Sequence, residues 1–377
     1  MSLPPLPPPS WVNLESTLGC NLECRMCGSF LTGVTKQRKV MAPALLDKVR
    51  TQLLPGAQDL SLTVAGEPFM TPKLGTFVDL AEDNQVSLQL NSNATLIKDS
   101  DLLSRLLRQS SVVKFSIDGA TRATYEDIRV KADFGRVLEN VRLVVRTRAA
   151  LPRQSRPRLV LCMVLMRSNL HELVDMVDLC RDLGLDRLEV AHLTAFTDEI
   201  DRAEALRHWP DDADAAIRAA RARADALGLR AHLPPLMSGE RLTPSTRARA
   251  KLALDEARGI TRTRLARLTT TLQRKRSQAR WARQAGGQVG CHFLREGVFV
   301  TIGGDVAPCP MPGRPIVGNL LEQDFDAIWN GETLTAMRRG LIDGQPFDCC
   351  AHCSQNPNGH VPGDPQTVQP DHGLDLA

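Results

Sequence analysis

Residues 19–27 read Gly-Cys-Asn-Leu-Glu-Cys-Arg-Met-Cys and follow directly after a β-rich run at 11–17. The three thiols Cys20, Cys24 and Cys27 have the spacing C-x3-C-x2-C and can converge on one inorganic centre. A cubane iron–sulfur cluster usually takes four Cys ligands, so three would leave one iron open to a small molecule. On spacing alone the alternatives are a zinc site completed by a distant ligand, or buried thiols without a special role.

Short β-rich runs alternate with amphipathic runs of helical length from this point to about residue 192. The alternation predicts βα units and a parallel sheet, and six such units would form a curved, open barrel rather than a closed one. In such sheets chemistry collects where the strands end. The predicted strands are Trp11–Thr17, Leu60–Val64, Val86–Asn91, Val112–Ile117, Arg158–Met166 and Arg187–His192, and the predicted helices are Ala42–Leu53, Leu74–Glu82, Asp99–Arg108, Phe134–Arg148 and Leu170–Leu183.

The fold class is therefore predicted as α/β: a partial (β/α)6 barrel with a helical insertion and a small C-terminal module of a β-hairpin and a helix. The proline-rich start should be an extended, largely solvated arm. The insertion is basic, because residues 239–284 hold 13 Lys and Arg against 3 Asp and Glu, although the whole chain has a net charge of only +4. The predicted segments are the arm 1–10, the barrel 11–197, the insertion 198–288, the cluster module 289–356 and a flexible tail 357–377.

Composition excludes several classes of protein. No apolar run reaches the ~20 residues of a membrane-spanning helix, and the first residues lack the basic and apolar regions of a secretory signal, so we expect a cytoplasmic protein without a membrane partner. Ten cysteines in 377 residues are too few for a disulfide scaffold and are expected to be metal ligands or catalytic groups. Aromatic residues make up only 4%, which argues against a nucleic-acid surface of stacked rings.

The cysteine motif after a first strand resembles that of the radical S-adenosylmethionine (radical SAM) enzymes. The resemblance implies a [4Fe–4S] cluster whose open iron chelates the amino and carboxylate groups of SAM. It also implies that the reduced cluster passes one electron to the sulfonium, giving methionine and a 5′-deoxyadenosyl radical that abstracts a substrate hydrogen atom. An external one-electron reductant such as flavodoxin or ferredoxin would then be a partner.

Further stretches match that family's pattern. Residues 65–68, Ala-Gly-Glu-Pro, are similar to its G-E-P stretch: Gly66 would allow close backbone approach, and Glu67 would bind the SAM ammonium. Asn93 stands where the family often has the glycine of a T-N-G stretch, and asparagine tolerates left-handed geometry less easily than glycine. The resemblance makes all three residues cofactor-binding candidates.

Residues 115–119, Phe-Ser-Ile-Asp-Gly, are similar to an S-I-D-G stretch of the subgroup with C-terminal cluster modules. The resemblance implies that Ser116 contacts SAM, with Asp118 in the same site, and that Arg129 pairs with the SAM carboxylate as a planar fork. Met26 would contact adenine through its backbone and thioether, and Leu193 could also contact adenine.

A second group of cysteines reads Cys291-x12-Gly304-x4-Cys309, and then Cys349-Cys350-x2-Cys353. It surrounds a predicted hairpin and a short helix near 324–330. Spacing alone leaves zinc and iron–sulfur ligation equally open. The arrangement resembles the SPASM and twitch modules, and five cysteines instead of the seven of a full SPASM module imply one auxiliary [4Fe–4S] cluster. The implied ligands are Cys291, Cys309, Cys350 and Cys353.

The remaining cysteines are Cys349, Cys162 and Cys180. Cys349 is a spare thiol, an alternative ligand or a catalytic hydrogen-atom donor. Cys162 in a strand and Cys180 in a helix are expected to be small buried hydrophobic residues.

The predicted function is hydrogen abstraction from a C–H bond of a small natural product or peptide, with net oxidation and the auxiliary cluster as electron acceptor. One alternative is an epimerase or peptide-modifying enzyme that uses a Cys hydrogen donor. An alternative of another class is a non-catalytic iron–sulfur sensor or nucleic-acid-binding protein that binds its partner through the basic segment 239–284. The favoured interpretation of that segment itself is a solvated helix. A sensor needs no SAM pocket, so the G-E-P and S-I-D-G stretches favour the enzyme.

Overall fold

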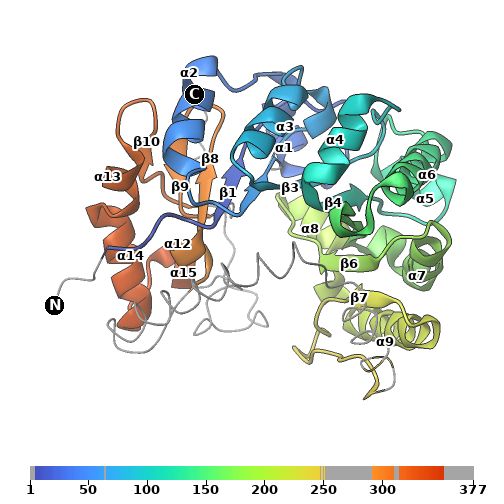
Figure 1. Ribbon diagram of the computed structural model, residues 1–377. Helices are drawn as coiled ribbons and strands as arrows, with labels where there is room; N and C mark the ends of the chain where they lie inside the picture. The colour runs from blue at the N-terminus through green and yellow to red at the C-terminus, as the bar shows by residue number, and fades with distance from the viewer. Residues whose placement is uncertain are drawn as a thin grey trace.

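The structure is a computed structural model and describes residues 5–62, 65–246, 248, 250, 291–309 and 314–351. Its centre is one open sheet in the order β10-β9-β8-β1-β2-β3-β4-β5-β6-β7, which Figure 1 shows running across the molecule. Strands β1 to β7 are parallel to one another, and β8 is parallel to β1. The strands are β1 Trp11–Leu14, β2 Asp59–Ser61, β3 Ser87–Ser92, β4 Ser110–Ser116, β5 Arg158–Leu165, β6 Arg187–His192, β7 Arg230–His232, β8 Gly297–Val300, β9 Asp305–Ala307 and β10 Gly318–Asn319.

Helices follow the strands and cover one face of the parallel part of the sheet, as α3, α4 and α6 do in Figure 1. Short 3-10 turns and one π-helical turn, η2, complete the connections. The helices are α1 Gly28–Leu31, α2 Pro43–Lys48, α3 Leu74–Asp83, α4 Asp101–Gln109, α5 Arg122–Ile128, α6 Phe134–Ala150, α7 Leu173–Asp182, α8 Asp198–Glu204, α9 Pro210–Leu227, α12 Phe293–Glu296, α13 Phe325–Trp329, α14 Glu332–Ile342 and α15 Asp348–Ala351. The turns are η1 Val34–Lys36, η2 Val49–Leu53, η3 Pro68–Met70, η4 Arg153–Ser155, η5 Arg167–Glu172 and η6 Leu206–His208.

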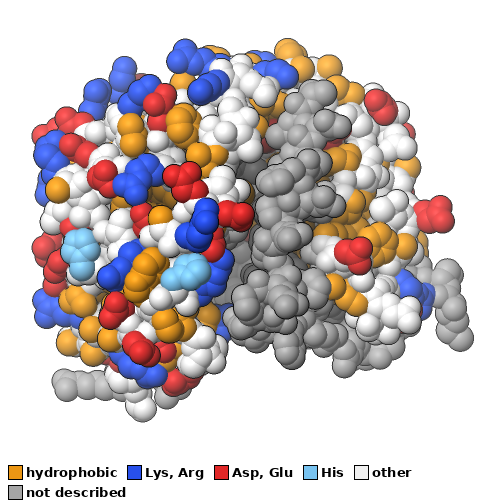
Figure 2. Space-filling view, turned by 180° about the vertical axis from the view of Figure 1, so that it is seen from behind, with side chains coloured by type: hydrophobic (Ala, Val, Ile, Leu, Met, Phe, Trp, Pro, Cys, Tyr) orange, Lys and Arg blue, Asp and Glu red, His pale blue; other side chains and the backbone are white. Residues whose placement is uncertain are grey.

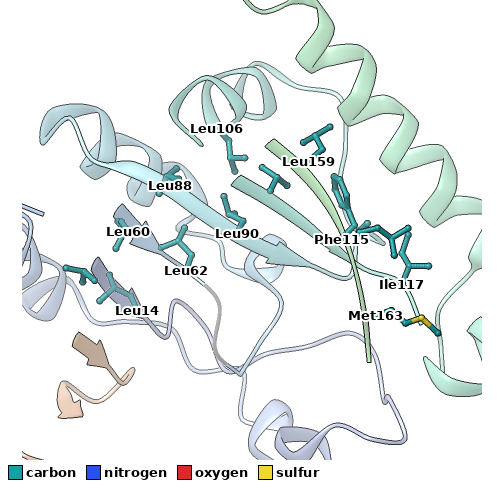
Figure 3. Close-up of a cluster of buried hydrophobic side chains, with 14 of the residues drawn as sticks. Leu14, Leu60, Leu62, Leu88, Leu90, Leu106, Phe115, Ile117, Leu159 and Met163 are labelled. Atoms are coloured by element: carbon teal, nitrogen blue, oxygen red, sulfur yellow. The ribbon is translucent and has the colours of Figure 1, made fainter. Parts of the chain in front are cut away.

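The core lies between the sheet and these helices. Alternate residues of each strand, such as Leu88 and Leu90 of β3 and Leu159 of β5, point into it and are fully buried (Figure 3). The residues between them point to the other face, as the period of two in a strand requires, and most of those in β3, β4 and β6 are polar. We call this side of the sheet, opposite the apolar core, its polar face.

This architecture confirms the predicted α/β class with an open parallel sheet. Each of the six predicted strands is present, and so is the hairpin, as the antiparallel pair β8 and β9. One expectation was wrong: the insertion 198–288 is not helical throughout, because β7 adds a seventh parallel strand beside β6. This strand has only three residues, Arg-Ala-His, and two of them are polar, so the sequence shows no strand pattern there.

The N-terminal arm also differs from the prediction. Leu6 is 4% exposed, the backbone N–H of Leu6 donates to Asn330 Oδ1 at 2.9 Å, and Trp329 Nε1 donates to Pro7 O at 2.9 Å. The arm residues that the structure describes are therefore packed on the C-terminal module rather than solvated. Most of the basic segment 239–284, from residue 251 onward, lies outside the described residues.

None of the described helices is both long enough and apolar enough to cross a membrane. On the face seen from behind, acidic and basic side chains are interspersed with hydrophobic ones (Figure 2).

Candidate active site

The cysteine loop lies between β1 and α1 and is held by backbone hydrogen bonds. Glu23 N donates to Val130 O at 3.1 Å and Arg25 N to Ile128 O at 3.0 Å, which ties the loop to the end of α5. The thiols of Cys20, Cys24 and Cys27 lie in one small hydrophobic cluster, which also contains Leu22, Met26, Ile128, Met166 and Leu193. The structure thus brings together the three predicted iron ligands and two predicted adenine contacts, Met26 and Leu193.

Gly66 lies against the backbone that leads into this loop. A Cβ atom at Gly66 would be 2.4 Å from Thr17 O and 2.6 Å from Gly19 O, which no side-chain movement could relieve. The N–H of Glu67 donates to Gly19 O at 2.8 Å. Residue 66 must therefore lack a side chain for the loop after β2 to support the cysteine loop.

Glu67 is buried, and its carboxylate is bound by donors of the protein. Oε1 accepts from Ser92 Oγ at 2.7 Å and from Phe69 N at 3.1 Å, and Oε2 accepts from Asn93 N at 2.7 Å. Burial raises the pKa of Glu67, and these hydrogen bonds oppose the shift. The carboxylate joins η3 to the end of β3, and its predicted contact with the SAM ammonium remains a prediction.

Asn93 connects the end of β3 to the cysteine loop. Its Nδ2 lies 3.0 Å from Asn21 Oδ1 and 3.8 Å from Cys20 Sγ, and its Oδ1 accepts from Thr95 N at 3.0 Å. The left-handed residue of this turn is Ala94, with φ 60°, and not Asn93. Asparagine at residue 93 therefore does not have to adopt the left-handed geometry that it tolerates less easily than glycine, and its role in binding the cofactor stays a prediction.

Asp118 and Arg129 form a buried ion pair beside the cysteine loop. Arg129 Nε donates to Asp118 Oδ2 at 2.7 Å, and Asp118 Oδ1 accepts from Val164 N at 2.7 Å. Burial lowers the pKa of Arg129, but Asp118 and the Cys24 thiol outweigh this and raise it overall. The guanidinium Nη1 is 4.0 Å from Cys24 Sγ. Asp118 thus holds the positively charged Arg129 side chain beside the predicted iron site. Pairing of Arg129 with the SAM carboxylate stays a prediction.

The chemistry of the three thiols and of their surroundings fits an iron–sulfur cluster. In a cubane each thiolate binds a different iron, so its ligands need not meet at one point. Burial raises the pKa values of Cys20 and Cys24, that of Cys24 to about 11, so cluster binding must displace protons from these thiols. The loop, the close approach at Gly66 and the nearby Arg129 fit such a group.

The second group of cysteines is also assembled as far as the structure describes it. Burial, the largest cause, and the thiols of Cys349, Cys309 and Cys291 together raise the pKa of Cys350 to about 12. Three of the four predicted auxiliary ligands are therefore neighbours, although they come from separate parts of the chain: just before α12, just after β9 and within α15. Cys353 lies outside the described residues. Cys349 is exposed, and its Sγ is 3.8 Å from Cys350 Sγ.

The polar face of the sheet contains two residues that were not predicted from the sequence, Glu189 and His232. They lie in one row with Ser116 and Cys162, because the four are register partners on the neighbouring strands β4 to β7. Lys114 Nζ donates to Glu189 Oε2 at 2.6 Å. Alternation of polar and apolar residues along β4 and β6 could have predicted this face.

Cys162 and Cys180 have different surroundings. Cys180 is fully buried in α7, as predicted. Cys162, predicted as a small buried hydrophobic residue, is partly buried, but it lies beside a carboxylate rather than in the apolar core, with its Sγ 3.9 Å from Glu189 Oε2. It faces away from the core because it lies between the core residues Leu161 and Met163 of β5. Ser116 Oγ, in the same row, donates to Asn91 Oδ1 at 2.8 Å.

A cavity of 510 Å³ opens beside the cysteine loop. It lies between Met26, Ile128 and Met166 on one side and α8 on the other. Arg25 Nη2 donates to Glu204 Oε1 at 2.8 Å and joins the loop to the end of α8. The position of α8 next to the site was not predicted from the sequence.

Comparisons with known proteins agree with this geometry. The model of the radical SAM superfamily matches residues 14–150, and that of the SPASM iron–sulfur cluster-binding domain matches residues 291–354. No curated protein sequence matches the chain. Together the two family matches support a SAM-binding [4Fe–4S] cluster in the N-terminal part and an auxiliary iron–sulfur cluster in the C-terminal part.

Solved structures are similar in fold. SuiB of Streptococcus suis bound to S-adenosylmethionine has a TM-score of 0.58 and 13% identity, over 89% of this chain and 68% of SuiB. SuiB bound to the precursor peptide SuiA has a TM-score of 0.57 and 15% identity, over 88% and 67%. Native anSMEcpe with bound AdoMet and the Kp18Cys peptide has a TM-score of 0.58 and 15% identity, over 92% of this chain and 87% of anSMEcpe. The chain thus carries a radical SAM domain, matched at residues 14–150, and a SPASM-type iron–sulfur cluster-binding domain, matched at residues 291–354.

Proposed function

We propose that this radical SAM enzyme abstracts a hydrogen atom from a C–H bond of a peptide or small natural product and that the net reaction is an oxidation. The observation that carries the proposal is the assembly of Cys20, Cys24 and Cys27 against a frame made by the loops after β2, β3 and β4. A closed zinc site or a sensor needs no such frame, because neither has to hold a small molecule beside the thiols.

The residues of the frame have separate roles. When bound, the reduced iron–sulfur cluster supplies the electron that cleaves SAM. The three cysteines hold that cluster, Gly66 allows the backbone to approach the loop, and Asn93 holds Asn21 and Cys20 in place. Arg129, oriented by Asp118, offsets the negative charge of the thiolates. Met26 and Leu193 supply apolar surface suited to the adenine ring.

The polar face of the sheet is the proposed substrate side. Ser116 lies in the same row as Cys162 and Glu189, so a substrate on this face would lie next to the proposed SAM site. Charged and hydroxyl side chains suit a polar substrate. The peptides in the SuiB and anSMEcpe structures favour a peptide over a small molecule. Flavodoxin or ferredoxin as reductant, and a cytoplasmic location, are parts of the same proposal.

The auxiliary cluster is the proposed electron acceptor. Cys291, Cys309 and Cys350 already lie together, and with Cys353 they would provide four protein ligands and no open iron. A fully ligated cluster of the twitch type can take the electron that a substrate radical loses. Cys349, the fifth thiol, is exposed beside this group and stays the proposed catalytic or alternative-ligand thiol.

One observation favours a second function, epimerisation. Cys162 faces the substrate side, and burial raises its pKa to about 12, so it is a neutral thiol at physiological pH. A neutral S–H can return a hydrogen atom to a substrate radical. Cys162 is therefore a second candidate hydrogen donor beside Cys349.

SAM cleavage tests the proposed enzyme class. The protein is reconstituted with iron and sulfide without oxygen and incubated with dithionite and SAM, and 5′-deoxyadenosine and methionine are measured. We expect wild type and Cys180→Ala to form both products, and Cys24→Ala to form neither. Absence of 5′-deoxyadenosine from wild type with an intact first cluster, with and without candidate peptides, would contradict the enzyme proposal.

Product mass then separates the two reactions in the same incubation, run in deuterated water. Loss of two hydrogens supports oxidation. An unchanged skeleton with one deuterium taken up would instead support epimerisation, and loss of that deuterium in Cys162→Ala or Cys349→Ala would identify the donor.

A further inference from the structure

The segment between α1 and α2 contains three exposed basic residues, Lys36, Arg38 and Lys39. Within the described part of the chain, none of the three has an acidic partner within ion-pair distance. By contrast, Arg25 and Lys131 nearby are paired with Asp127 and Glu23. The positive charge of this segment, residues 36–39, is therefore not neutralised by its described surroundings.

Segment 36–39 is joined directly to the cysteine loop. Lys39 O accepts from Leu18 N at 3.0 Å and from Thr17 Oγ1 at 3.1 Å, and Thr17 forms a β-bridge with Val40. A Cβ atom at Gly19 would be only 3.5 Å from Arg38 Cα. Segment 36–39 is thus hydrogen-bonded directly to Leu18, which lies two residues before Cys20.

The conformation of the segment brings cations and apolar groups together. Arg38 has φ 50°, a left-handed conformation that is uncommon for a residue other than glycine. Lys36 Nζ lies 5.7 Å from the centre of the Phe30 ring, and Phe30 is in α1 directly after Cys27. Leu31, the next residue of α1, is 42% exposed. A basic surface with an exposed leucine therefore adjoins the cysteine loop.

We propose that residues 36–39 and Leu31 form the docking surface for an acidic one-electron carrier protein that reduces the SAM-binding cluster. The proposal rests on the proposed function, which needs one electron at that site. In the step, the carrier loses one electron and the iron–sulfur cluster gains it, and no proton or group is transferred. Positive charge next to the acceptor would steer an acidic carrier to it, and small, transient interfaces are typical of such encounters.

Cluster reduction is measured by stopped-flow absorbance, with reduced flavodoxin as the carrier and dithionite as a donor that needs no docking surface. The test variant is Lys36→Glu with Lys39→Glu, and the neutral step is Lys36→Gln with Lys39→Gln. Arg38 is left unchanged because of its left-handed backbone. The matched control is Arg142→Glu with Arg146→Glu on the exposed side of α6, which makes the same change in net charge far along the chain.

We expect the Glu pair to slow reduction by flavodoxin about tenfold at low salt, with an intermediate effect of the Gln pair and a smaller difference at high salt. Reduction by dithionite and the iron content should not change. Binding of oxidised flavodoxin, measured by calorimetry, should weaken in the same order.

Two outcomes would overturn the docking surface: wild-type rates in the Glu pair, or equal slowing in the α6 control. Neither outcome would contradict the proposed enzyme function, because that function is tested separately by SAM cleavage with dithionite as the reductant.

Discussion

Gly66 is a position at which one added methyl group would displace the cysteine loop. In Gly66→Ala the new Cβ would overlap the carbonyl oxygens of Thr17 and Gly19, which belong to the backbone and cannot rotate away. We expect iron content and 5′-deoxyadenosine formation to fall at least about tenfold while far-ultraviolet circular dichroism stays native, because the strain of one to several kcal/mol falls on the loop.

Gly75→Ala is the matched control for this prediction. Gly75 lies in α3, and the nearest atom to an added Cβ there is Leu102 Cδ1 at 3.9 Å. Alanine in a helix should leave iron binding unchanged and stabilise the fold by about 0.5–1 kcal/mol. Equal iron binding in Gly66→Ala and Gly75→Ala would show that the close approach at residue 66 does not support the site.

The short helix α5 carries Arg129 at its end and is fastened at its start by one carboxylate. Glu172 of η5 accepts from Ala120 N, Thr121 Oγ1 and Thr124 Oγ1, each at 2.6 Å. Burial alone would raise the pKa of Glu172, but these hydrogen bonds outweigh it and hold the pKa below its usual value of 4.5. Glu172 thus stabilises the fold in its ionised form.

Glu172→Gln should destabilise the protein by about 2 kcal/mol at pH 7, because hydrogen bonds to a charged acceptor are lost. The lowered pKa makes this contribution complete above pH 4.5 and lost as the pH falls through the folded-state value. Denaturant unfolding is measured without oxygen at pH 7, and at lower pH as far as the clusters remain bound. The difference in free energy of unfolding between wild type and Glu172→Gln should become smaller only near and below pH 4.5. The control is Glu139→Gln on exposed α6; a variant at 172 that behaves like it would contradict the prediction.

At the scale of the whole molecule, the N-terminal arm and β1 pack directly against the C-terminal module. Strand β8 continues the sheet beside β1, and Trp329 of α13, 1% exposed, is covered by the arm through its hydrogen bond to Pro7 O. Arg338 lies over the indole ring, 4.4 Å from a ring centre. The C-terminal module is therefore bound to the rest of the fold by both the sheet and the arm.

Trp329→Ala should lower the free energy of unfolding by about 3–5 kcal/mol, and Trp329→Phe, which keeps most of the ring but loses the hydrogen bond, by about 1 kcal/mol. Because the sheet is continuous, both variants should still unfold in one transition. Calorimetry and denaturant unfolding measure both quantities. Separate transitions of the module and the barrel would contradict a shared structure.

Much of the parallel sheet could be predicted because its signals are local. Alternating apolar residues and short buried runs mark the strands through β6, whose bounds, Arg187–His192, agree with the prediction. The partner of β1 could not be predicted in this way. Pairing of Trp11–Leu14 with Gly297–Val300 joins residues almost three hundred positions apart, and no local pattern specifies which strand lies at an open edge.

The sequence by itself determined the class of chemistry, because the spacing of Cys20, Cys24 and Cys27 and the glycine at 66 are local requirements of one loop and its neighbour. Tertiary structure alone decided how the side chains are used. It committed the Glu67 carboxylate to Ser92 and Asn93, and turned Cys162 to the polar face of the sheet, beside Glu189. It also placed the basic segment 36–39 beside the cysteine loop. Hydrogen bonds and close contacts between residues distant in sequence depend on how the strands are stacked, and that stacking exists only in the folded chain.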